Sequence, residues 1–127
     1  MRYILEKEEG GYPSPTEREK LNKAIARYRN IIKNVPSGPL IGEIKFGLAD
    51  LLVGRDEEGD YKEALGLYGD IMKTAPKGYL WAKSVVGHSE ILIRLGIVDQ
   101  AKEAIGKVRE ARETLQKFVG NRDFFTV

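Results

Sequence analysis

The residues of this chain that could take part in catalysis are few and lie close together in the sequence. His88 is the only histidine, and Ser89 and Glu90 follow it directly. Serine, histidine and a carboxylate are the components of nucleophilic acyl transfer, but consecutive residues on a helix do not face each other. His88 falls on the inward face of its segment, between Ser84 and Ile91. We therefore expect a hydrogen-bonded core histidine rather than a catalytic base.

A pair of acidic residues is the other candidate for catalysis. Asp50 and Glu90 occupy corresponding positions of an internal repeat, and two carboxylates can act as general acid and base. Only composition supports such a pair, so an enzyme is kept as the less favoured alternative. The sequence has no His-Glu-x-x-His, Glu-x-x-His, phosphate-loop or Gly-x-Gly-x-x-Gly motif, and it has no cysteine. The prediction is no catalytic residue, no cofactor and no metal site.

Composition is that of one ordinary globular domain. The chain has 127 residues, of which 42% are hydrophobic and 31% charged, and its net charge is +2. Charges of both signs alternate along the chain, which argues against a nucleic-acid surface. No apolar run is long enough to insert in a membrane, and the first nine residues do not form a secretory signal. A cytoplasmic protein is the default expectation, unless the chain is a domain excised from a longer precursor.

Apolar residues recur with helical spacing and predict an all-α fold without strands. Ser14, Pro15 and Glu17 form a capping box with proline at the first helical position. Pro36 and Pro76 end two helices, and Gly96 ends another. Five helices are expected. The second is opened by Gly38-Pro39 and continues to residue 53, and the other four cover 15–34, 60–74, 79–95 and 99–119.

An internal repeat with an offset of forty residues is the most informative pattern in the chain. The matched positions are Ala24, Tyr28, Ile31 and Pro36 in one copy and Ala64, Tyr68, Ile71 and Pro76 in the next. Gly47 also corresponds to Gly87. Repeats of this length are single supersecondary units that bury their apolar faces by stacking. Two further glycines, Gly66 and Gly106, lie inside expected helices, where close helix contact would explain them.

This spacing resembles the second helix of the tetratricopeptide repeat (TPR), which has alanine, then an aromatic residue, then proline. The turn into that helix is matched at Gly59, Tyr61 and Ala64, and again at Gly96 and Ala101. The resemblance implies antiparallel helix-turn-helix repeats stacked as a short right-handed α-solenoid of about five helices. It also implies that Tyr28 and Tyr68 fill the gap towards the next helix pair.

The chain departs from the common TPR pattern in length and in its first helices. The offset of forty exceeds the usual unit of about 34 residues, and the Trp-x2-Leu-Gly-x2-Tyr signature is largely missing. The longer spacing resembles bacterial envelope-assembly TPR proteins, such as the β-barrel assembly lipoprotein and the Tol–Pal coordinator. An excised domain would therefore place the protein in the bacterial envelope.

The expected organisation is one repeat domain between two short terminal segments. Residues 1–13 are assigned to an N-terminal tail or a short partial helix, 14–119 to the TPR-like domain, and 120–127 to a C-terminal tail. The first copy has a second-type helix but no evident first-type partner, which leaves an apolar edge. That edge is covered by the N-terminal tail, by a missing repeat or by another copy of the chain.

The TPR resemblance also implies a binding groove on the concave side, lined by the first helices of successive pairs. Such grooves receive an extended or helical peptide. For Val86, and for Val53 on the other expected first helix, interhelix packing is an equally good interpretation. The expected groove residues are Glu43, Phe46, Asp50, Lys83, Val86, Glu90 and Arg94.

These patterns favour a non-enzymatic module that scaffolds a complex by binding a partner protein or peptide in this groove. No nucleic acid and no direct membrane insertion are expected. The main alternative is structural, a homo-oligomer that associates through the unpaired first helix or the Phe124-Phe125 tail. The sequence leaves the identity of the partner open.

Overall fold

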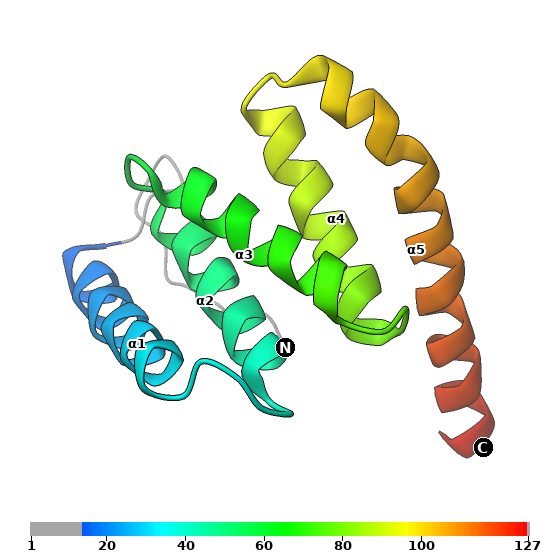
Figure 1. The fold of residues 1–127 in the computed structure, drawn as a ribbon, viewed down its shortest axis with the longest axis horizontal. Helices are drawn as coiled ribbons and strands as arrows, with labels where there is room; N and C mark the ends of the chain where they lie inside the picture. Colours follow the sequence, from blue (N-terminus) through cyan, green and yellow to red (C-terminus); the bar gives the residue numbers. More distant parts are fainter. Residues whose placement is uncertain (1–13, 127) are drawn as a thin grey trace. The chain divides into compact units, whose positions relative to one another are not determined.

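A computed structural model describes the backbone of residues 14–126 and the side chains as far as Phe118, so the expected N-terminal partial helix lies outside the described residues. Five helices and no strand occur in this range, which confirms the all-α prediction (Figure 1). They are α1 (Pro15–Asn34), α2 (Ile41–Arg55), α3 (Asp60–Thr74), α4 (Tyr79–Arg94) and α5 (Val98–Thr126).

Local signals explain where most helices begin and end. Ser14 Oγ accepts a hydrogen bond of 3.2 Å from the backbone N–H of Glu17, as expected of a helix cap. After α4, Gly96 has a φ of +71°, and the N–H of Ile97 donates to the carbonyl of Leu92 at 3.0 Å. The N–H of Gly96 donates to Ile93, which completes a Schellman motif. These ends follow from residue type alone.

Two helix boundaries differ from the prediction. α2 begins at Ile41 rather than at Gly38-Pro39: Gly38 has a φ of +135°, outside the helical range, and Leu40 is the N-cap. α5 continues to Thr126, so residues 120–126 extend the helix instead of forming a separate tail. Residues 98–126 contain no proline, whereas Pro36 and Pro76 follow α1 and α3, and the helix continues through Gly120.

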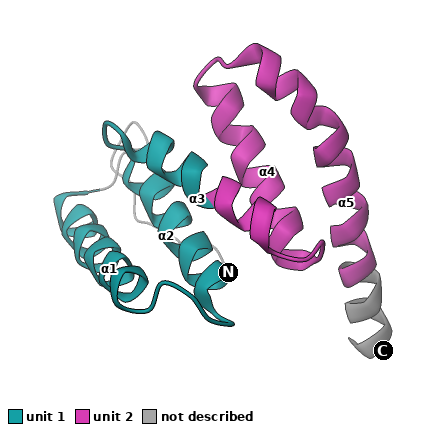
Figure 2. Ribbon diagram, in the orientation of Figure 1, with its two compact units in different colours: residues 1–67 teal, residues 68–127 magenta. Residues whose placement is uncertain are grey.

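The chain forms two compact units, residues 1–67 and 68–127, with the boundary inside α3 (Figure 2). In the first unit α1 packs on α2, and its buried residues include Leu21, Ile25, Leu48, Ala49 and Leu52. In the second unit α4 packs on α5 around a buried cluster of Trp81, Ala82, Val85 and Ala111.

Polar and aromatic contacts join α5 to the beginning of α4 in the second unit. Lys77 Nζ lies 2.9 Å from Glu110 Oε1 and 5.5 Å from the centre of the Trp81 ring. The rings of Tyr79 and Phe118 meet edge to face with their centres 5.5 Å apart. These contacts position the second half of α5 along α4.

The forty-residue offset is reproduced in the packing of two tyrosines on two glycines. Tyr28 of α1 lies against Gly47 of α2, and Tyr68 of α3 lies against Gly87 of α4. A β-carbon at Gly87 would lie 2.7 Å from Tyr68 Cζ, closer than real side chains approach. Each tyrosine therefore packs on the helix that follows it, and the arrangement into helix pairs that the TPR resemblance implies stays a prediction. At Gly66 and Gly106, in contrast, an added β-carbon would have no neighbouring side chain or other helix within 4 Å, so the expected close contact at these two glycines is wrong.

Candidate functional site

The seven expected groove residues lie on two helices that belong to different units. Glu43, Phe46 and Asp50 are on α2 in the first unit. Glu43 is exposed, whereas Phe46 and Asp50 are half-buried. The opposite side of α2 carries its buried residues, Leu48, Ala49, Leu51 and Leu52.

The other four residues are on α4 and differ in their surroundings. Val86 packs against the buried cluster around Trp81, which supports its interpretation as a packing residue. Lys83 Nζ lies 4.6 Å from the centre of the Tyr79 ring, a cation–π contact. Glu90 and Arg94 are exposed. Within α4, a partner would therefore meet mainly the charged residues of the predicted set.

Ser89, one member of the possible catalytic group around His88, is engaged by the backbone. Ser89 is buried, and its hydroxyl donates to the carbonyl of Val85 at 2.9 Å. Its proton is therefore held by the backbone rather than offered to an imidazole. We expected His88 to be buried in the core. It is only half-buried, so that expectation was wrong.

The pKa of His88 is lowered from its ordinary value, first by burial and then by the positive charge of Lys107. Both effects disfavour the imidazolium form in the folded chain. The unfolded state therefore binds more protons than the folded state once the pH falls below about 6.5. The contribution of His88 to stability is present above that pH and decreases as the pH falls towards the folded pKa.

A His88→Gln variant is expected to remove this pH dependence. When the pH falls from about 7 to about 5, the free energy of unfolding should decrease more for wild type than for the variant. Urea denaturation at the two pH values measures the increment. Lys107→Gln should raise the pKa of His88 in an NMR titration, and an unchanged pKa would contradict the assigned contribution of Lys107.

A charged cluster that sequence reasoning missed lies at the turn between α2 and α3. The guanidinium of Arg55 donates to both carboxylate oxygens of Asp60, at 2.9 and 2.6 Å, and to Asn22 Oδ1 of α1 at 3.1 Å. The backbone N–H of Glu57 donates to the same carboxylate at 2.9 Å. The cluster therefore ties α1, α2 and α3 together within the first unit. The sequence feature that could have predicted this cluster is an acidic residue at the start of α3, five positions after an arginine.

Asp60 has the environment of a structural rather than a catalytic carboxylate. Its side chain is 3% exposed. Burial alone would raise its pKa, but the hydrogen bonds from Arg55 and the Glu57 N–H together hold the pKa below the ordinary value. A carboxylate kept ionised by a bidentate arginine stabilises the turn and is a poor proton donor.

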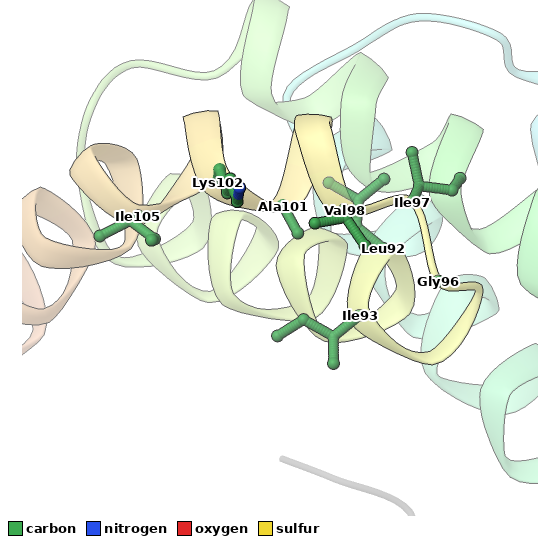
Figure 3. A pocket seen from close by; sticks show the side chains of 8 residues that line it. All are labelled: Leu92, Ile93, Gly96, Ile97, Val98, Ala101, Lys102 and Ile105. Atoms are coloured by element: carbon green, nitrogen blue, oxygen red, sulfur yellow. The ribbon is translucent and has the colours of Figure 1, made fainter.

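An apolar pocket of about 300 Å³ opens between the end of α4 and the first turns of α5 (Figure 3). Apart from the stem of Lys102, its lining consists of aliphatic residues and glycine. The lining residues are Leu92, Ile93, Gly96, Ile97, Val98, Ala101, Lys102 and Ile105. Apolar lining of this kind suits another protein's side chains or an apolar ligand.

Together, the helices and contacts define an all-α protein built from packed helix pairs. No family model, no curated protein and no solved structure matches this chain, so the TPR resemblance depends on the residues of the repeat itself. In the part of the chain that the structure describes, no three histidine or acidic side chains gather where they could hold a metal ion. No helix within that part is long and apolar enough to span a membrane.

Proposed function

We propose that this chain is a non-enzymatic scaffold, a short right-handed solenoid of TPR-like helix pairs that binds a partner protein or peptide. The supporting observation is the tyrosine-on-glycine contact, which recurs at the same offset as the sequence repeat. A unit that repeats its packing contact presents similar surfaces at regular intervals, and arrays of this kind serve as binding scaffolds.

The partner contacts are assigned to polar residues of α2 and α4, the first helices of their pairs. Glu43 on α2 and Glu90 and Arg94 on α4 are exposed, and Asp50 is half-buried. Charges of both signs in this set fit a partner segment of mixed polarity. Val86 contributes packing to the second unit instead of partner contacts.

The double variant Asp50→Lys with Glu90→Lys tests this assignment. Affinity for a partner identified by crosslinking and confirmed with purified protein is expected to fall about tenfold or more, or about 1.4 kcal/mol. Isothermal titration calorimetry measures the affinity. Glu58→Lys with Glu103→Lys makes the same change of charge at exposed positions outside α2 and α4 and should bind normally. Equal affinity of both variants would refute the role of α2 and α4.

A further inference from the structure

The apolar pocket between α4 and α5 is bordered by large aliphatic side chains that are open to solvent. Ile93 is 68% exposed, Val98 59% and Ile105 58%. Figure 3 shows Ile93 on α4 and Ile105 and Val98 on α5 around the same opening. Isolated exposed aliphatic residues are common, but a group of them around an apolar pocket marks an interaction surface.

The repeat indicates what kind of structure covers such a surface. Ala24, Ala64 and Ala101 are matching positions, and the residues four places later are Tyr28, Tyr68 and Ile105. Tyr28 and Tyr68 are each covered by a glycine of the following helix. α5 is the last helix of the described residues, and Ile105 is exposed. A helix is therefore the natural occupant beside Ile105.

The face of α5 that carries Ile105 also has a distinctive charge. Lys102, Arg109 and Arg112 are spaced so that they share this face with Val98 and Ile105. We call these five residues the α5 strip. Its three cations are exposed and form no ion pair within residues 14–118, and one acidic residue, Glu113, lies beside them four positions after Arg109. The corresponding residues of the first copy are apolar: Ile25 and Ile32 of α1, and Val35, which directly follows that helix.

This composition excludes two simple occupants. If a further repeat of the same kind packed against the strip, the strip would need apolar residues along its whole length, as the first copy has. Three of its five residues are cations instead. A two-fold contact between two copies of the strip would bring cations against cations, which is destabilising. If this face were simply exposed to water, its cations would be explained, but the exposed Ile93, Val98 and Ile105 would not.

We infer that the α5 strip and the adjoining pocket bind an amphipathic helix of a partner protein, with acidic residues beside its apolar stripe. The apolar part of that helix fills the pocket next to Ile93 and Ile105. Its acidic part lies along Arg109 and Arg112, where charge-assisted hydrogen bonds form. This surface shares no residue with the set on α2 and α4 proposed above, although Ile93 lies one helical turn from Glu90, so the chain would have a second binding surface that adjoins the first on α4.

The test uses two synthetic helical peptides of about five turns each. One has an apolar stripe of leucine and alanine flanked by glutamate, and the other has lysine in place of every glutamate. Fluorescence anisotropy with the full chain is expected to show at least tenfold tighter binding of the acidic peptide. Arg109→Glu with Arg112→Glu should reverse that preference, and Ile105→Glu should weaken the binding of the acidic peptide.

The controls separate this surface from the one on α2 and α4. Lys107→Glu with Lys117→Glu makes the same change of charge on α5 outside the strip and should leave peptide binding unchanged. Glu43→Lys with Asp50→Lys, both on α2, should also leave it unchanged, so either proposal can fail without the other. Equal binding of the two peptides, no binding of the acidic peptide, or insensitivity to the Arg109 and Arg112 changes would overturn the inference.

Discussion

Asp60→Ala is expected to lower the free energy of unfolding by about 3–5 kcal/mol. The side chain of Arg55 is only 14% exposed, and the substitution removes the carboxylate that receives two of its hydrogen bonds. The arginine is then left with Asn22 and a 3.8 Å contact with Glu57. Such a loss is a large part of the roughly 5–15 kcal/mol that holds a domain folded. Urea denaturation followed by circular dichroism measures it.

An exposed ion pair of similar length is the matched control for Asp60→Ala. Arg29 Nη2 lies 2.6 Å from Glu63 Oε1, but the two side chains are 46% and 38% exposed. Arg29→Ala should therefore cost less than about 1 kcal/mol. Replacing both charges, as Arg55→Met with Asp60→Leu, should be less damaging than Asp60→Ala because no buried cation is left unpaired. A loss for Asp60→Ala no larger than that for Arg29→Ala would contradict the structural role.

Helix positions were predictable because their determinants are local. Ser14 determines a helix start through its side-chain hydroxyl, and Pro36 and Gly96 determine helix ends through their backbone, whatever the rest of the chain does. The start of α2 was misplaced for the opposite reason. Gly38-Pro39 is compatible with either a turn or a helix start, and only the φ of +135° at Gly38 decides between them.

The functional surface was less predictable because it depends on which side chains meet. Arg55 and Asp60 pair across a turn in which Asp56 adopts a left-handed φ of 55°, a geometry that spacing alone does not specify. For Ile105, the repeat identified the equivalent position, but only the structure shows that the side chain is uncovered there. Val86 has the right spacing for a groove, and the structure shows it half-buried against the second unit's buried cluster, a contact that spacing alone does not specify.

Gly87→Ala is the second substitution with a large expected effect. In most helix interiors, alanine is more stable than glycine by about 0.5–1 kcal/mol. Gly87 should show the opposite sign, because a β-carbon there would lie 2.7 Å from Tyr68 Cζ and 2.9 Å from its Cε2. Tyr68 is only 2% exposed, so its ring cannot move out into solvent without disturbing the residues packed around it. Overpacking of this kind costs about 1–3 kcal/mol, which thermal and urea unfolding would detect.

Three further variants show whether the tyrosine ring is the cause. Gly66→Ala, at a helical glycine with no neighbour within 4 Å, should stabilise the chain and so provide the control. Gly47→Ala should cost less than Gly87→Ala, because the half-buried Tyr28 can swing outward. Combining Gly87→Ala with Tyr68→Leu should cost less than the sum of the two single losses, because the leucine removes the atoms that clash. Strict additivity, or stabilisation by Gly87→Ala alone, would show that the ring-on-glycine contact does not limit the approach of α3 and α4.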